Sequence, residues 1–182
     1  MEVIYYATYQ TPWVSLLVAS SAQGLLAVRF VRQGDVGAEL AWLRKRFPGA
    51  ELVHSPEFNR KAIEELESYS RGDRQEFTVP LDLHGSPFQV RVWQALGQIP
   101  FGETRSYADI ARALGSPKAF RAVGIANRNN PVCIVVPCHR VIGSDGNLCG
   151  FGGGLKLKQQ LLDHEQRQRV LTTGQTTATP SE

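Results

Sequence analysis

The sequence predicts an α+β protein: a small N-terminal antiparallel sheet with helices, followed by a C-terminal helical domain. Two observations indicate this division. Segments rich in Val, Ile, Tyr and Leu alternate with turn residues near the N-terminus, which is typical of short antiparallel strands. Short, capped amphipathic segments follow Pro80 and indicate a helix-turn-helix, after which comes a short strand bearing Cys138. We expect domains at residues 1–82 and 83–169, and a disordered tail at 170–182.

The first 82 residues contain the segments expected to form the sheet. Turn residues separate their apolar runs, so we expect three strands in a meander, at residues 2–9, 12–19 and 24–31. Two helices are expected at 39–46 and 57–70, the second because its apolar residues recur at helical spacing. An extended segment should follow at 76–83, and Pro80 within it favours a sheet edge or a linker.

Capping residues divide the C-terminal half into short helices. Ser86-Pro87 is an N-cap followed by proline at the first helical position, so a helix is expected at 88–96. Ser106 caps a second helix, in which apolar residues recur at i, i+3, i+4 and i+7 from Tyr107. Ser116-Pro117 caps a third, at about 117–127. Two helices joined by a tight Gly-Ser-Pro turn are typical of a helix-turn-helix.

The third of these helices carries a basic stripe. Lys118, Arg121 and Arg128 fall at steps of three and seven, so they share a face with Gly124. A glycine inside a helix costs about 1 kcal/mol relative to alanine. A cationic stripe with a bare patch of backbone suits a helix that lies against nucleic acid. The alternative is that Gly124 permits close packing on a neighbouring helix.

The segment from Pro131 to Arg140 combines an apolar run with reactive side chains. Residues 132–136 are expected to form a strand that ends at Pro137 and brings Cys138 and His139 to the edge of the core. Cys138 is either reactive or a small buried residue, because free cysteine is among the most buried residue types. The glycine-rich segment 150–154 lacks the Lys-Ser/Thr of a phosphate loop, so nucleotide binding is not expected. A last helix is expected at 155–165.

Composition and charge narrow the class of protein. The 182 residues are 42% apolar and 20% charged, as in ordinary globular proteins, and no apolar run could span a bilayer. The N-terminus does not resemble a secretory signal, so we expect a cytoplasmic location and no membrane partner. Three cysteines without a Cys-x-x-Cys pair favour reduced thiols over disulfides or zinc. Residues 84–140 hold seven Arg and Lys against two Asp and Glu, which indicates either a polyanionic partner or a solvated basic face.

The run Pro137-Cys138-His139-Arg140, together with motifs on both sides of it, resembles the O6-alkylguanine-DNA alkyltransferases. The resemblance covers about residues 86–165 and is highly specific as an ordered series. The N-terminal half matches only in general character, which implies the ribonuclease-H-like domain of that family. The motifs that carry the resemblance are Phe88-x-x-x-Val92-Trp93, Pro100-x-Gly102, Ser106-Tyr107, Arg121-Ala122-Val123-Gly124, Asn130-Pro131, Pro137–Val141, Gly153-Gly154 and His164-Glu165.

The resemblance implies direct-reversal DNA repair by a suicide methyltransferase. The alkyl group of O6-alkylguanine would move irreversibly to Cys138, one event per molecule and with no cofactor or metal; O4-alkylthymine is left open as a substrate. His139 would act through a water as the base that makes the thiolate. Glu165 would orient His139, and Asn130 would join that network.

The resemblance also implies how DNA is held. The partner would be duplex DNA bound through the minor groove by a monomer, with the damaged nucleotide flipped out. Arg121 would fill the vacated position, and Tyr107 would hydrogen-bond the guanine. The Val141 carbonyl and the Gly152 amide would contact the base edge, and Phe151 would stack on it. Gly124 and Arg128 would lie on the DNA-facing side of the same helix as Arg121.

Three residues depart from the family pattern. Phe151 stands where tyrosine is common, Phe120 where a small residue is common, and Cys133 where some members have proline. Phe120 beside Arg121 could act as an extra wedge or alter the fit to the groove. Three other functions stay open on sequence alone: a non-catalytic binder of alkylated DNA, a helix-turn-helix transcription factor and a cysteine hydrolase.

Overall fold

A four-stranded sheet forms the N-terminal half of the computed structural model, which describes residues 2–32 and 34–174, and side chains as far as Leu171. Its strands are β1 (Val3–Gln10), β2 (Ser15–Ser20), β3 (Leu25–Val31) and β4 (Glu51–His54), in the order β3-β2-β1-β4. The expected antiparallel meander β1-β2-β3 is confirmed. The sheet as a whole is mixed, because β4, which we did not expect, pairs in parallel with β1.

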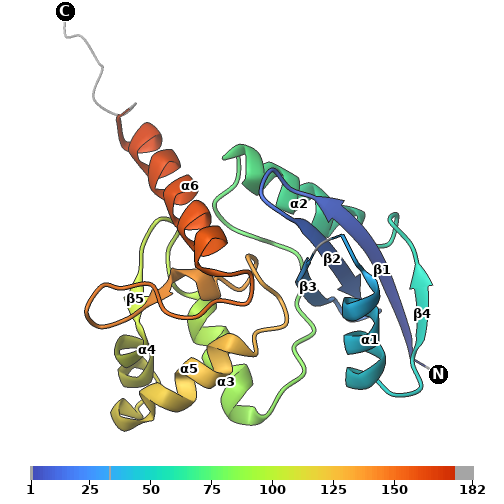
Figure 1. The fold of residues 1–182 in the computed structure, drawn as a ribbon, viewed down its shortest axis with the longest axis horizontal. Helices are drawn as coiled ribbons and strands as arrows, with labels where there is room; N and C mark the ends of the chain where they lie inside the picture. The colour runs from blue at the N-terminus through green and yellow to red at the C-terminus, as the bar shows by residue number, and fades with distance from the viewer. Residues whose placement is uncertain (1, 33, 175–182) are drawn as a thin grey trace, which may run out of the picture.

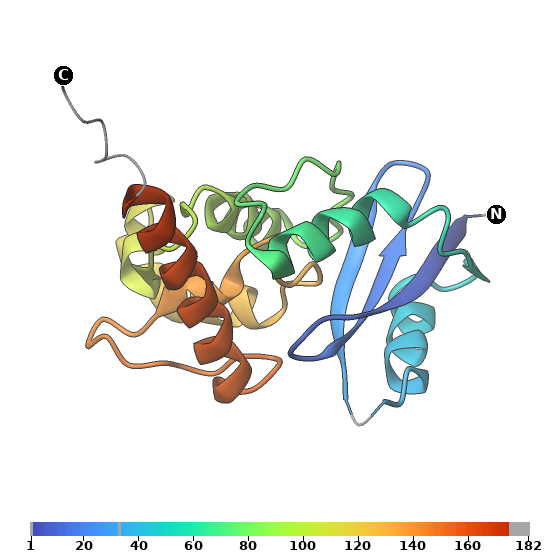
Figure 2. The same ribbon diagram turned by 90° about the horizontal axis from the view of Figure 1, so that it is seen from above.

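Helices cover both faces of this sheet (Figure 2). α1 (Gly37–Arg46) packs on one face, where Leu43 joins a core cluster with Ile4 and Leu17. α2 (Arg60–Arg71) packs on the other, where Leu66 lies in the same cluster as Leu16. Neighbouring residues of β2 thus face opposite helices, as the two-residue repeat of a strand requires. α2 begins three residues later than expected, and α1 two residues earlier.

The C-terminal half is helical, as expected (Figure 1). Ser86 and Ser106 each form a capping box, with Gln89 and Asp109 respectively. Ser116 makes no side-chain cap; a 3-10 turn at Pro117–Ala119 leads into the third helix instead, which corrects the expected start at 117. The helices are α3 (Pro87–Gly97), α4 (Tyr107–Ala113), α5 (Phe120–Arg128) and α6 (Leu155–Gly174).

The buried face of α5 is fixed by contacts with α3. The indole Nε1 of Trp93 donates a hydrogen bond to the Ala126 carbonyl at 2.9 Å, and Val123 is fully buried on the same side of α5. Arg121 and Arg128 are exposed. The basic face therefore points outward from a helix whose inner face is anchored.

Residues 132–136 are not the strand that their β-branched side chains predict. Val132 and Cys133 form only isolated bridges, and Ile134 has φ of 71°. A positive φ is unusual for a β-branched residue and costs about 1–3 kcal/mol, so the surrounding packing must impose it. Residues Cys138–Arg140 form a 3-10 turn, which leads into β6 (Val141–Ile142), paired in parallel with β5 (Arg105–Ser106).

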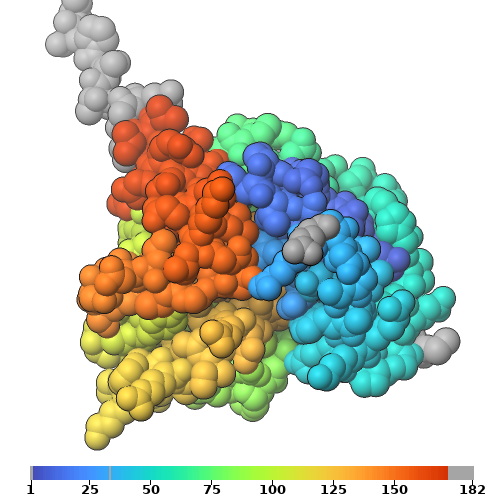
Figure 3. Space-filling model, in the orientation of Figure 1, coloured from blue at the N-terminus to red at the C-terminus, as the bar shows by residue number. Residues whose placement is uncertain are grey.

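The two halves share hydrogen bonds along the free edge of β3. Val28 donates to the Pro131 carbonyl and accepts from the Cys133 amide, both at 2.9 Å. Farther along the same edge, within the N-terminal half, Leu25 donates to the Pro80 carbonyl at 2.8 Å. Pro80 thus lies at a sheet edge, and the segment before Cys138 continues the sheet. Figure 3 shows the two halves in contact over a broad front.

α6 is longer than expected. It runs to Gly174, past residue 170 where we expected the tail to begin, and the remaining part of that tail, 175–182, lies outside the described residues. Across the part of the chain that the structure describes, no helix has the length and apolar character needed to cross a membrane.

Candidate active site

Cys138 lies in the 3-10 turn that ends the buried segment and is 3% exposed. The neighbouring Cys133 thiol lowers the pKa of Cys138 and outweighs burial, which alone would raise it. Asn130 and the Lys158 ammonium lower the pKa of Cys138 further. The surroundings therefore favour the thiolate, which is the nucleophilic form of cysteine.

His139 points away from solvent and contacts Glu165. Its Nε2 lies 2.6 Å from Glu165 Oε1, and both side chains are fully buried. Burial lowers the pKa of His139 below its ordinary value although Glu165 acts in the opposite sense. The ionised carboxylate can only accept, so Nε2 carries the hydrogen. Nδ1 has no hydrogen-bond partner within the described residues, so it is available to take a proton.

Glu165 is the centre of a buried polar network. It accepts hydrogen bonds from the Tyr69 hydroxyl at 2.8 Å and from the Gly102 amide at 3.0 Å. Arg140 donates to it through Nε at 2.8 Å and Nη2 at 3.0 Å. Burial opposes the charge on Glu165, but His139 and Arg140 outweigh it and hold the pKa of this carboxyl well below its usual range. The network therefore keeps a permanent negative charge behind His139.

Asn130 was expected to join that network, but its side-chain amide lies on the cysteine side of the site. Its Nδ2 donates to the Val136 carbonyl at 2.8 Å, and its Oδ1 accepts from the Val132 amide at 3.0 Å. The Cys133 sulfur lies 3.7 Å from the Asn130 backbone carbonyl. Asn130 thus braces the turns that carry Cys138.

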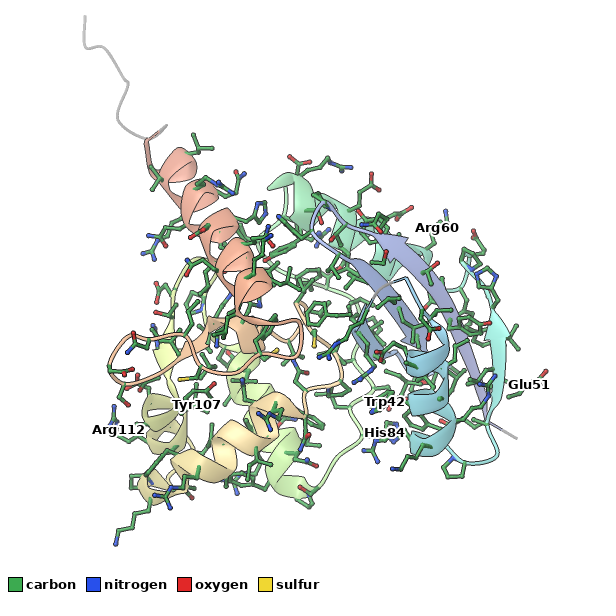
Figure 4. The ribbon with its side chains drawn as sticks, in the orientation of Figure 1. Trp42, Glu51, Arg60, His84, Tyr107 and Arg112 are labelled. Atoms are coloured by element: carbon green, nitrogen blue, oxygen red, sulfur yellow. The ribbon has the colours of Figure 1, made fainter. Side chains whose placement is uncertain are left out.

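Tyr107 begins α4 and lies against α5 (Figure 4). Burial raises the pKa of its hydroxyl, so this group keeps its proton and can donate. A Cβ added at Gly124 would lie 3.8 Å from the Tyr107 ring, which is ordinary contact. Close packing of the helices therefore does not require glycine there. Arg121 lies with its guanidinium 5.8 Å from the centre of the exposed Phe120 ring.

The two backbone groups expected to face the base are each next to a cation. The Val141 carbonyl accepts a hydrogen bond from the Lys158 ammonium at 2.6 Å. The Gly152 carbonyl, on the peptide that follows the expected amide donor, accepts from Arg32 at 2.7 Å. Phe151 is half-buried, with its ring centre 5.3 Å from that of Phe30.

Comparison with known proteins agrees with this geometry. The family model described as "6-O-methylguanine DNA methyltransferase, ribonuclease-like domain" matches residues 4–83, and that of the DNA binding domain matches residues 87–167. A methylated-DNA–protein-cysteine methyltransferase of Mycolicibacterium paratuberculosis is 46% identical over 165 residues, or 91% of this chain and 94% of the relative. The chain belongs to the 6-O-methylguanine DNA methyltransferase family.

Other members of the methyltransferase family also cover most of the chain. The inducible methylated-DNA–protein-cysteine methyltransferase of Bacillus subtilis is 45% identical over 150 residues, which cover 82% of this chain and 83% of the relative. The crystal structure of Mycobacterium tuberculosis OGT in complex with DNA matches with a TM-score of 0.77 and 41% identity, covering 90% of this chain and 94% of that one. The mixed sheet with helices and the helical C-terminal half are therefore the fold of this family.

Three residues of this methyltransferase site did not stand out in the sequence: Tyr69, Lys158 and Arg32. Arg140 stood in the motif but had no assigned partner, and the structure gives it Glu165 and the Ile99 carbonyl, the latter at 2.6 Å. Lys158 is fully buried, although a lysine among polar neighbours on a helix is usually solvated. The long sequence separation of each pair explains why no local signal marks them.

Proposed function

We propose that this chain repairs DNA by direct reversal, moving an alkyl group from O6 of guanine to Cys138 in a single irreversible event. The observation that carries the proposal is a buried cysteine of lowered pKa, next in the chain to a histidine held by Glu165. A protein that only bound alkylated DNA would need neither feature. The family membership established above supports the same reaction.

Proton transfer comes first in the proposed mechanism. Nδ1 of His139 accepts the Cys138 proton, directly or through a water, and the charge of Glu165 stabilises the resulting imidazolium. The thiolate then attacks the alkyl carbon, so that an S–C bond forms and the C–O6 bond breaks. The electron pair of that bond stays with guanine, which takes up the proton held by His139, and Tyr107 donates a hydrogen bond to the base. The thioether product has no leaving group of comparable quality, so the reaction stops there.

The burial of Cys138 requires that the base leave the duplex. A base inside the stack could not reach a thiol that is 3% exposed, so the nucleotide must be flipped, at a cost of a few kcal/mol. We infer that Arg121 fills the vacated position while α5 lies in the minor groove. Gly124 would let the backbone approach, and Arg128 would meet the phosphates. Every residue of the site lies on one chain, so we propose that a monomer acts.

The direct test is to locate the alkyl group after reaction with duplex DNA containing O6-methylguanine. Mass spectrometry of the digested protein should show one added methylene on the peptide that holds Cys138. The peptide with Cys149 serves as an internal control, and Cys138→Ser should leave the lesion in place. Repair that leaves Cys138 unmodified, or more than one lesion removed per molecule, would contradict the mechanism.

Base flipping by Arg121 can be tested separately. Arg121→Ala should slow repair of duplex DNA by at least about tenfold, while transfer from free O6-benzylguanine, which needs no flipping, should change little. Arg60→Ala, at an exposed arginine on α2, is the matched control for loss of positive charge. Equal losses on both substrates would remove the assigned role of Arg121.

A further inference from the structure

The glycine-rich loop at residues 150–154 is held by the end of β3, which belongs to the other half of the chain. Nη2 of Arg32 donates to the Gly152 carbonyl at 2.7 Å. The Phe30 and Phe151 rings are tilted by 57° with centres 5.3 Å apart. A Cβ at Gly153 would lie 3.1 Å from the Phe30 ring and 2.4 Å from the Leu157 side chain. The loop is therefore fitted between β3 and α6, and a side chain at residue 153 would require Leu157 and Phe30 to move.

Such a loop needs support from outside itself. Three successive glycines, 152 to 154, have no side chains to restrict their backbone, so holding them in one conformation costs more entropy than for other residues. A hydrogen bond to the Gly152 carbonyl fixes the plane of the peptide that follows it, because the peptide unit is rigid. The adjoining peptide supplies the Gly152 amide, which is the group expected to meet the base edge.

We propose that Arg32 is a positioning residue for alkyl transfer: together with Phe30, it fixes the peptides around Gly152 so that the loop presents one wall of the guanine pocket. This inference rests on the proposed function. It gives the N-terminal half a part in the reaction beyond support for the fold. Arg32 acts through the loop and does not touch the base.

The position of Arg32 makes the proposal testable without disturbing the core. Phe30 is 6% exposed, so its truncation would also open a cavity, whereas the Arg32 side chain is exposed and its removal leaves the core intact. Arg32→Ala should slow single-turnover transfer about three- to tenfold, the range expected for one partly exposed hydrogen bond from a charged donor. The loss should be the same for free O6-benzylguanine and for duplex DNA, because both substrates use the same base pocket.

Two further variants test rescue at residue 32 and the loss of a positive charge elsewhere in the same half. Arg32→Lys keeps a donor and should recover most of the rate, whereas Arg44→Ala, at an exposed arginine on α1 of the same half, should behave as the unmodified protein. Hydrogen exchange should be faster at the amides of residues 152–154 in Arg32→Ala, with no change in unfolding temperature. A purely structural role would lower the unfolding temperature instead.

Each result either supports or overturns the positioning role of Arg32. Arg32→Ala with unchanged transfer on both substrates would overturn the proposal, as would a lysine variant as slow as the alanine variant. A loss confined to duplex DNA would mean that Arg32 contacts the phosphate backbone and not the loop. If the unmodified protein does not become alkylated at Cys138 in the same assay, the proposed function itself is contradicted. This result is distinct from any effect of the Arg32 variants.

Discussion

Glu165→Gln removes the charge at the centre of the buried network while keeping nearly the same shape. In the folded protein, Glu165 accepts from His139, Arg140, Tyr69 and the Gly102 amide. A glutamine offers one acceptor oxygen, and its amide nitrogen would face groups that are themselves donors. The Arg140 guanidinium, 5% exposed, would lose its counter-charge and would be left with the Ile99 carbonyl and a share of the single glutamine oxygen.

The expected loss of stability is large. Breaking a buried ion pair from one side costs about 3–5 kcal/mol, since the remaining charge stays buried without compensation. A domain of ordinary stability has about 5–15 kcal/mol in total, so the variant should show a clearly lower urea midpoint. The transfer rate should fall as well, by at least about tenfold, because an amide donor opposite Nε2 favours the His139 tautomer with hydrogen on Nδ1. That tautomer cannot accept the cysteine proton.

A double variant separates these two effects. Glu165→Gln with Arg140→Met removes the stranded guanidinium, and replacing a buried ion pair by apolar groups is often neutral for stability. We therefore expect the double variant to regain most of the urea midpoint but not the rate. The assay pairs urea unfolding with single-turnover transfer at a temperature where both variants are folded. A single variant that unfolds at the original midpoint, or that transfers at the original rate, would refute the account of the network.

Three further predictions concern the thiol and the DNA-facing helix. Lys158→Met should raise the pKa of Cys138, because it removes a neighbouring positive charge. The transfer rate should then fall more at about pH 6 than at about pH 9. A pH–rate profile with an unmoved midpoint would exclude this role of Lys158. Gly124→Ala should stabilise the protein by up to about 1 kcal/mol in thermal unfolding, since the added Cβ meets no obstacle. The same variant should bind duplex DNA more weakly in a titration. Unchanged binding would show that the backbone at residue 124 makes no contact with DNA. If the exposed Phe120 ring stacks on a base, Phe120→Ala should lose about 1–3 kcal/mol of binding free energy for duplex DNA, and Phe120→Trp should keep it. Equal affinities of the unmodified protein and both variants would count against a wedge.

Local signals account for the parts of the fold that could be predicted. The starts of α3 and α4 follow from Ser86 and Ser106, whose side chains cap the next turn of the same helix. The pairing of His139 with Glu165 came from a family resemblance, and the two side chains are indeed in contact. These features depend on residues close in sequence or on a motif that fixes distant positions together.

The features that sequence reasoning missed depend on packing between distant segments. β4 has four residues of mixed burial, and only its partner β1, some fifty residues earlier, makes it a strand. The run at 132–136 has the composition of a strand, yet the chain must turn within it to bring Cys138 toward Asn130, and Ile134 takes the unfavourable φ. Tyr69 and Glu165 are 96 positions apart, so no spacing rule could join them.

The hydrogen bonds along β3 also bear on how modular this protein is. An unpaired strand edge tends to recruit other chains, and here the edge of β3 is occupied at Val28 by the segment that carries Cys138. Separating the halves between residues 83 and 87, where the two family models meet, would expose that edge and remove the sheet partner of the Cys138 segment. Engineering that exchanges one half for that of a relative must therefore preserve the backbone hydrogen bonds between β3 and the segment before Cys138, because each of the two fixes the position of the other.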